Sequence, residues 1–283
     1  MRIDLHVHST ASDGTRPPAE VMARAAAAGL DVVALTDHDT TAGWAAAAGA
    51  LPGGLTLLPG AEISCAVEDP GSGEVVGLHL LGYLFDPAEP ALAAELYALR
   101  EDRRRRATEM VELLRSLGAP VDHAVVAALA GDGAVGRPHI ARALVQAGVV
   151  PHAGAAFTPE WIGDGGRAWV AKHAMDPLAA IALVRAAGGV TVLAHPGAET
   201  RGAVVGDDVI AAMAAAGLDG IEVDHPDHSA ATRHRLSSLA ESLQLLATGS
   251  SDDHGSFTGD RIGCETTSPA AYEALVARVR VSG

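Results

Sequence analysis

Cysteine and aromatic residues are scarce in this chain of 283 residues. Its two cysteines, Cys65 and Cys264, are far apart and lack Cys-x-x-Cys spacing, so the sequence indicates neither a disulfide framework nor a thiolate zinc site. Aromatic residues make up 3% of the chain, which predicts a core of Leu, Val, Ile and Ala. Beyond disfavouring cysteine chemistry, this composition says little about function.

Basic residues and long apolar runs are also few. The chain has 20 Lys and Arg against 35 Asp and Glu, a net charge of −15, which argues against binding a long nucleic-acid duplex but not against a small phosphate ligand or a strand end. No run approaches the roughly 18 uncharged apolar residues that a membrane span requires. Arg2 and Asp4 leave no room for the apolar core of a signal peptide. We therefore expect a cytoplasmic protein with no membrane partner.

Short β-rich runs alternate with alanine-rich helical runs at both ends of the chain. This alternation is typical of βα units that build a parallel sheet. The predicted strands are residues 3–7, 31–36, 55–64, 75–84, 190–194, 220–223 and 243–248. The predicted helices are residues 17–28, 41–48, 177–187, 207–216, 229–242 and 269–280. The seven strands predict one α/β barrel.

Residues 88–172 interrupt the alternation. A long helix over 90–117 is followed by short helical pieces separated by Gly and Pro, with no convincing strand. We therefore expect a discontinuous catalytic barrel, residues 1–87 and 173–283, and a helical insertion domain, residues 88–172. The insertion is expected to cover the mouth of the barrel as a substrate cap.

Several predicted strands end in residues that can bind metal. His6 and His8 are two positions apart, so a strand directs both imidazoles to one face and toward one ion. Asp252 and His254 have the same spacing after the last strand, and His38 follows the second strand. Barrel strands deliver their C-terminal residues to a common mouth. The recurrence predicts a multinuclear metallohydrolase.

Some neighbouring residues have two interpretations. Asp37 is expected to hydrogen-bond to a metal ligand from behind, and Asp39 is either part of this group or the N-cap of the next helix. Asp13, in the polar loop 9–15, is either an oxygen ligand or a turn carboxylate before the helix at Pro17. The residues alone leave both questions open.

Glu62, His79 and His195 lie in apolar strand-like runs. An isolated carboxylate at Glu62 would be costly to bury, so it needs a cation, and its two oxygens can bridge two ions. The alternative, a buried arginine partner, has no candidate nearby in the sequence. A single strand histidine is more often a hydrogen-bonded core residue. Beside the other groups, however, His79 and His195 are predicted to bind metal.

The order of these motifs resembles the PHP (polymerase and histidinol phosphatase) phosphoesterases. The resemblance spans nearly the whole chain and rests on His6-Val-His8, Asp13-Gly14, Leu35-Thr-Asp-His-Asp39, Gly60-Ala-Glu-Ile-Ser64, His79, Ala194-His-Pro-Gly197 and Gly249-Ser-Ser-Asp252-Asp-His254. It implies a distorted (β/α)7 barrel that holds three divalent metal ions. Manganese is the first expectation, and iron or zinc suit the same ligands.

The resemblance also implies how the ligands are shared. One ion would be held by His6, His8, Glu62 and Asp252, a second by Asp13, His38 and His254, and a third by Glu62, His79 and His195. Several family members carry histidine where Asp13 stands. Aspartate there is similar to a branch that contains 3′,5′-nucleoside-bisphosphate phosphatases and a 5′→3′ exoribonuclease.

The insertion of this branch also resembles residues 136–172 here. Arg137 and Lys172 are predicted to bind phosphate through a guanidinium fork and an ammonium, with His139 assisting. The alternative for Arg137 is a solvent-exposed position at a helix start. The run Arg103–Arg106 is expected to be a solvated helix face, of which one member could reach a second phosphate.

Residues after the sixth strand are expected to line the substrate side, namely Glu222, Asp224, His225 and His228. His228 and His234 are alternatively ordinary helix residues. A metal-bound water or His225 is the candidate general acid. The predicted catalytic residues are thus Asp13, His38, Asp252, His254, Arg137 and His225.

These residues predict hydrolysis of a phosphomonoester by a metal-bridging hydroxide. Through the resemblance, the expected substrate is a nucleoside 3′,5′-bisphosphate that loses its 3′-phosphate. Three alternatives stay open. They are a 5′→3′ exonuclease acting on short 5′-phosphorylated RNA or DNA oligonucleotides, a histidinol-phosphate phosphatase, and a non-catalytic protein that binds metal and phosphate.

Overall fold

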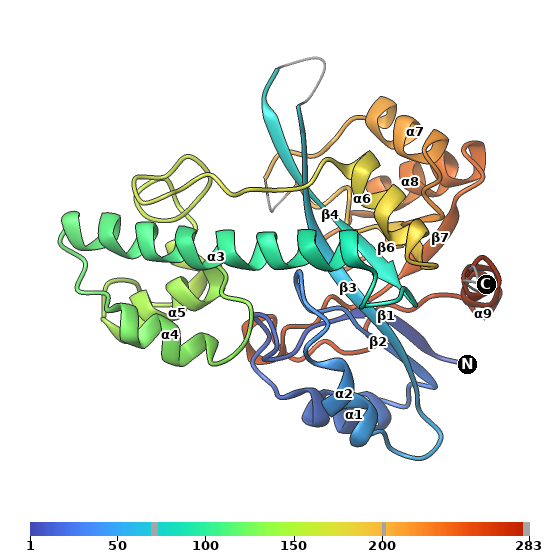
Figure 1. Ribbon diagram of the computed structural model, residues 1–283, viewed down its shortest axis with the longest axis horizontal. Helices are drawn as coiled ribbons and strands as arrows, with labels where there is room; N and C mark the ends of the chain where they lie inside the picture. The colour runs from blue at the N-terminus through green and yellow to red at the C-terminus, as the bar shows by residue number, and fades with distance from the viewer. Residues whose placement is uncertain (69–72, 200–201, 280–283) are drawn as a thin grey trace.

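The computed structural model describes residues 1–68, 73–199 and 202–279. Seven strands in this part of the chain form one sheet in sequential order: β1 (Ile3–Val7), β2 (Val32–Leu35), β3 (Thr56–Glu68), β4 (Val75–Tyr83), β5 (Val190–Leu193), β6 (Gly220–Asp224) and β7 (Leu246–Gly249). The first and last strands approach each other, because Val7 bridges Asp253 just beyond β7. The sheet is therefore a nearly closed barrel (Figure 1), and the predicted fold class is confirmed.

The helices around the barrel are α1 (Pro18–Ala27), α2 (Trp44–Gly49), α6 (Pro177–Ala186), α7 (Asp207–Ala215), α8 (Ala230–Ser242) and α9 (Pro269–Val276). Their limits follow local capping: α1 opens on a proline and is followed by Gly29 at φ 73°, and Asp176 accepts hydrogen bonds at the start of α6. The predicted helix 41–48 begins three residues late, at Trp44. The last helix ends at Val276, before the predicted end at residue 280, which itself lies outside the described residues.

Strand β4 departs from the expected parallel pattern. It pairs antiparallel with β3 and with β5, whereas β1–β2–β3 and β5–β6–β7 are parallel. Only residues 69–74 separate β3 from β4, too few for the crossover helix that a parallel neighbour needs. As a result Glu62 and His79 lie inside long strands, not at strand ends.

The insertion contains α3 (Pro90–Ser116), α4 (His123–Ala130), α5 (Arg137–Gln146) and the short 3-10 helix η1 (Ala153–Ala156). A hydrophobic cluster drawn from residues 107–168, including Met110, Leu114 and Ile140, joins these elements. In Figure 1, α4 and α5 lie beneath one half of α3, and the other half of α3 crosses the barrel strands. The exact domain boundaries stay a prediction. Within the described ranges, no helix is long and apolar enough to span a membrane.

Candidate metal centre

The first ligand group gathers at the ends of β1 and β7. His6 and His8 point the same way along β1, and their Nε2 atoms are 3.0 Å apart. Glu62 Oε2 lies 3.2 Å from His6 Nε2 and 3.1 Å from His8 Nε2. Asp252 Oδ1 lies 3.3 Å from each of these two nitrogens. These four buried residues are the set that the family resemblance assigned to one ion.

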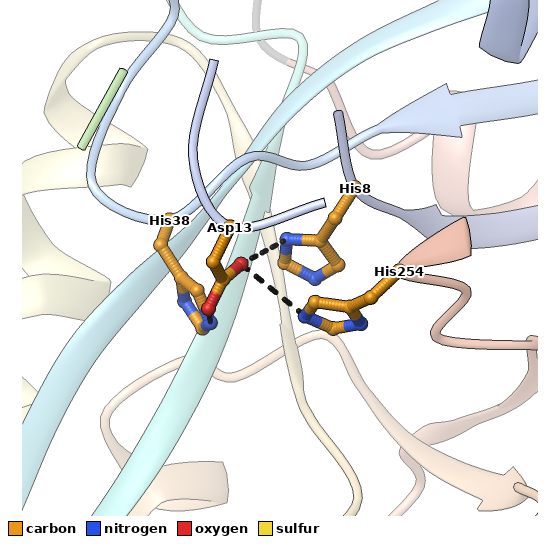
Figure 2. Close-up of side chains that lie close together, drawn as sticks. All are labelled: His8, Asp13, His38 and His254. Atoms are coloured by element: carbon orange, nitrogen blue, oxygen red, sulfur yellow. Dashed lines mark ion pairs between the residues drawn. The ribbon is translucent and has the colours of Figure 1, made fainter. Parts of the chain in front are cut away.

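The second group surrounds Asp13 (Figure 2). Asp13 Oδ1 lies 3.3 Å from His254 Nε2, and Asp13 Oδ2 lies 3.6 Å from His38 Nε2. His8 also borders this group, with Nδ1 at 3.8 Å from Asp13 Oδ1. The structure therefore brings together Asp13, His38 and His254, as implied, and adds His8 as a shared neighbour.

Asp37 holds the loop that brings Asp13 to the mouth of the barrel. Its carboxylate accepts hydrogen bonds from Ser9 N at 2.8 Å, Ser9 Oγ at 2.7 Å and Ser12 Oγ at 2.7 Å. These bonds fold the loop that carries Asp13 back over the barrel. Asp13 does not cap helix α1, whose N-cap residue is Pro17. Asp37 thus supports the site through a loop, as an outer carboxylate.

Glu62 uses its two oxygens in different directions. Oε2 faces His6, His8 and, at 3.1 Å, His38 Nδ1. Oε1 lies 2.8 Å from His79 Nδ1 and 3.0 Å from His195 Nε2. The tightest third group is His38, Glu62 and His79, and His195 contacts it through Glu62. With one oxygen facing each side, Glu62 would be able to hold an ion in each of two groups.

Two ligand imidazoles are held in the tautomer that metal binding needs. His6 Nδ1 donates to Glu222 Oε1 at 3.1 Å, and His254 Nδ1 donates to the carbonyl oxygen of Asp252 at 3.1 Å. Each bond fixes a proton on Nδ1, so Nε2 is the nitrogen that faces the carboxylates and would bind an ion. Metal-binding histidines in proteins are oriented by outer partners in this way.

Distances and charges in the centre fit divalent cations. His6 Nε2 lies 3.0–3.3 Å from the atoms of His8, Glu62 and Asp252, about the spacing of neighbouring ligands that each lie about 2.1 Å from one ion. Burial lowers the pKa of His6, but Asp252, Glu62 and Glu222 raise it well above the ordinary value. Because the carboxylates stabilise positive charge here, the donor set fits metal ions.

The predicted solvated run Arg103–Arg106 is split by the structure. Its two middle members are exposed and pair with acidic residues of α3. Arg103 and Arg106 turn inward instead, because residues three apart share a helix face. Arg103 Nε donates to Asp39 Oδ2 at 2.6 Å. The prediction was wrong for these two arginines, and Asp39 is a buried partner of α3, not a helix N-cap.

Lys172 completes a cationic cluster beside the ligands. Burial and the charges of Arg103, Arg106 and Arg137 lower the pKa of Lys172 to about 8. Burial and Lys172 in turn lower the pKa of His79 to about 4, although Glu62 opposes this. His79 is therefore a neutral imidazole at neutral pH, and the cations of the insertion border the metal ligands.

Arg137 is partly exposed and already has partners. Its Nη1 donates to Asp164 Oδ1 at 2.6 Å, and its guanidinium lies 5.6 Å from the centre of the Phe157 ring. Neither partner buries the group fully, since 27% of the side chain stays accessible. Arg137 is thus held at the edge of the cationic cluster.

The start of α5 lies against the ligands. His139 is buried, and its Nδ1 accepts a hydrogen bond from Gly136 N at 3.0 Å, which closes the first turn. A methyl group added at Gly136 would lie 3.4 Å from Asp13 Oδ2 and 3.5 Å from Arg103 Nη1. The start of α5 therefore packs against Asp13 and Arg103, and His139 shapes this turn.

The two carboxylates of strand β6 differ in exposure: Glu222 is buried and Asp224 is exposed. Glu222 is buried, accepts from His6 and from His195 N at 2.7 Å, and lies behind the ligands instead of lining the substrate side. Asp224 is exposed and pairs with Arg233. Glu222 as an outer partner was missed, although its apolar neighbours in the sequence carry the signal used for Glu62.

His225 and His228, which follow β6, differ in how their ring nitrogens are hydrogen-bonded. His225 Nδ1 accepts from Asp227 N at 3.1 Å, so the neutral ring carries its proton on Nε2, 3.5 Å from Asp252 Oδ2. His228 donates from Nδ1 to Val223 O and accepts at Nε2 from Gly197 N. Both nitrogens of His228 hold loops together, whereas His225 presents a proton to the centre.

Three of the six non-glycine residues with positive φ in the described ranges lie in this centre. Asp39, His195 and Asp252 have φ of 54°, 29° and 48°, values that non-glycine residues rarely adopt. Such strain persists where surrounding bonds determine the conformation, and it clusters at functional sites.

Comparisons with known proteins agree with this geometry. Residues 4–118 match the PHP domain. A 5′-3′ exoribonuclease of Haemophilus influenzae is 37% identical, with 89% of this chain and 90% of that protein covered. A 3′,5′-nucleoside bisphosphate phosphatase of Chromobacterium violaceum is 38% identical, with 92% and 89% covered.

A solved structure gives the same answer for the fold. A protein of Bifidobacterium adolescentis, described as a metal-dependent phosphoesterase, superposes with a TM-score of 0.89 at 35% identity. The match covers 99% of this chain and 96% of the other. With relatives above 30% identity over most of both chains, this protein belongs to the PHP family of metal-dependent phosphoesterases.

Proposed function

We propose that this enzyme removes the 3′-phosphate of nucleoside 3′,5′-bisphosphates with three divalent metal ions, manganese first among the candidates. The observation that carries the proposal is the cationic cluster of Arg103, Arg106, Arg137 and Lys172 beside the ligand groups. Burial and the charges of the three arginines lower the pKa of Lys172, and a multiply charged phosphate substrate would offset these charges. A bisphosphate would offer its reacting phosphate to the metals with Arg137 and Lys172, and its second phosphate to Arg103 and Arg106.

The ligand roles proposed for the three ions follow the family sets. His6, His8, Glu62 and Asp252 would hold the first, Asp13, His38 and His254 the second, and Glu62, His79 and His195 the third. Divalent ions bound there would activate water and polarise the phosphoryl oxygens.

The side chains of this enzyme supply orientation, charge and a hydrogen bond to the leaving oxygen. Arg137 and Lys172 bind the phosphate oxygens, and their charges offset the charge that grows in the transition state. His225 carries its proton on Nε2 next to Asp252 and can donate a hydrogen bond to the leaving oxygen, which would take its proton from a water molecule. His139 keeps the first turn of α5 against Asp13, so Arg137, in the same turn, stays near the ligands.

A second candidate is 5′→3′ exonuclease activity on short 5′-phosphorylated oligonucleotides. It is favoured by the 37% identity to the Haemophilus exoribonuclease over 90% of that protein. The same centre would then act on a diester, and nucleotides would be products. For either activity, we propose a cytoplasmic location and a small phosphorylated substrate.

Phosphate release tests it directly. Manganese-loaded protein should release phosphate from 3′-phosphoadenosine 5′-phosphate faster than from histidinol phosphate. Asp252→Asn should abolish release, whereas Asp208→Asn, an exposed carboxylate on α7, should leave it unchanged. Faster cleavage of a 5′-phosphorylated RNA dinucleotide would favour the exonuclease. No release from any of these substrates would overturn both proposals.

A further inference from the structure

We propose that a cavity beside His254 binds the nucleobase of the substrate, an inference that rests on the proposed nucleotide-phosphatase function. The cavity, of about 480 Å³, lies between α5 and η1 of the insertion and two loops of the barrel. Its wall includes Thr15, Arg142, Val145, Gln146, His152 and Phe257. The volume falls in the roughly 300–1,000 Å³ range of small-molecule sites.

The position of the cavity fits the shape of a nucleotide. The Phe257 ring centre is 6.5 Å from that of His254, and Thr15 follows Asp13 by two residues. A hydrogen bond from Ser256 N to Thr15 Oγ1, 2.9 Å long, joins the two barrel loops. The cavity therefore begins next to the second ligand group. In a nucleotide, a single sugar ring separates the phosphate from the base.

The lining combines flat apolar contacts with free polar groups. Phe257 is partly exposed in a chain with only three phenylalanines, and Val145 adds an aliphatic contact. Arg142 and Gln146 lie one turn apart on α5, and across the described part of the chain neither side chain has a hydrogen bond or ion pair. A nucleobase needs both features, since its faces stack on aromatic rings and its edges bond to arginine and glutamine.

A second cavity, of about 220 Å³, matches a base less well. It is lined by Thr40, Arg100 and Arg104 and has no aromatic wall. Arg100 already donates to the carbonyl oxygen of Asp39, and Arg104 pairs with Glu101. Of these two cavities, only the one lined by Phe257 combines free polar side chains with an aromatic surface for stacking.

Binding measurements separate base recognition from turnover. Titration calorimetry on manganese-loaded protein should give tighter binding of 5′-AMP than of ribose 5-phosphate. Phe257→Ala should weaken 5′-AMP binding about 5- to 150-fold, the range expected for one stacked base, and leave ribose 5-phosphate unchanged. Gln146→Ala, a helix-surface change, should weaken 5′-AMP binding in the same direction. Leu113→Ala, on the exposed face of α3, is the control and should change neither.

The outcomes decide the pocket and the activity independently. Equal binding of 5′-AMP and ribose 5-phosphate, or unchanged 5′-AMP affinity in well-folded Phe257→Ala and Gln146→Ala proteins, would overturn the pocket even if bisphosphates are hydrolysed. Base-dependent binding that both variants weaken would support the pocket even if no phosphate is released, in which case the proposed function fails alone.

Discussion

Replacing Glu222 by glutamine tests whether the outer hydrogen bonds tune the metal centre. Glu222 accepts from His6 Nδ1 at 3.1 Å and from His195 N at 2.7 Å, and Ser250 Oγ also contacts it. Burial alone raises the pKa of Glu222, but His6 and its neighbours lower it to about 2. The group is therefore a buried carboxylate at neutral pH. Glutamine keeps its shape and removes its charge.

The magnitude follows from what glutamine can still accept. The single side-chain oxygen of glutamine can accept a hydrogen bond from either His6 Nδ1 or His195 N. Its NH2 group then faces the remaining N–H donor. A charge-assisted bond of about 1.5–3 kcal/mol becomes a neutral one of about 1 kcal/mol. Outer-partner changes of this kind typically weaken metal affinity by about 10- to 100-fold. We expect this loss for manganese, mainly at the ion that His6 is proposed to hold.

A chelator-competition titration of manganese measures the effect without relying on turnover. Glu241→Gln removes the same charge from the exposed face of α8 and should not change the affinity. Far-UV circular dichroism should show that both variants are folded. If folded Glu222→Gln protein bound manganese within twofold of the wild type, the proposed role of Glu222 would be refuted.

Three further predictions follow from the charges around the ligands. Lys172 has a pKa of about 8 and loses its charge above that pH, so the KM for a phosphorylated substrate should rise above pH 8. Lys172→Arg keeps its charge at these pH values and should flatten this pH profile of KM. Asp39→Asn should lower the unfolding free energy in urea by about 3–5 kcal/mol, because Arg103 loses its buried partner, and Asp31→Asn on the surface should cost far less. Burial lowers the pKa of His8, but Asp252 and Glu62 raise it to about 10. Manganese binding at pH 7 should therefore release protons and should tighten as the pH rises. Calorimetry in two buffers of different ionisation enthalpy measures the proton release, and finding none would contradict this prediction.

The strands and the gathering of the candidate ligand residues were predictable because both follow from local patterns. The spacing of His6 and His8 sets their common face, and the apolar run before each group marks where a strand delivers it. Motif order then added the family resemblance. The direction of β4 was not predictable in this way, because an apolar run has the same appearance in parallel and antiparallel strands.

Pairings across the chain were also beyond local reasoning. Asp39 and Arg103 are 64 positions apart, and the run of four arginines gives no sign of which two turn inward. Glu222 and His6 are 216 positions apart. For Glu222 a signal existed: a carboxylate between Ile221 and Val223 must be buried and therefore needs a partner. The identity of that partner required the fold.

The bond between Asp39 and Arg103 links the two halves of the proposed mechanism. Asp39 follows the ligand His38 directly and accepts from Ser64 N at 2.7 Å, so it is fixed to β3 two residues from Glu62. Arg103 belongs to α3, which also carries Arg106. The position of the cationic cluster is thus set by a residue adjacent to the metal ligands. Asp39→Asn should consequently weaken phosphate binding more than metal binding, since it frees α3 but leaves every ligand in place. Equal loss of both affinities would show that Asp39 supports the ligands themselves.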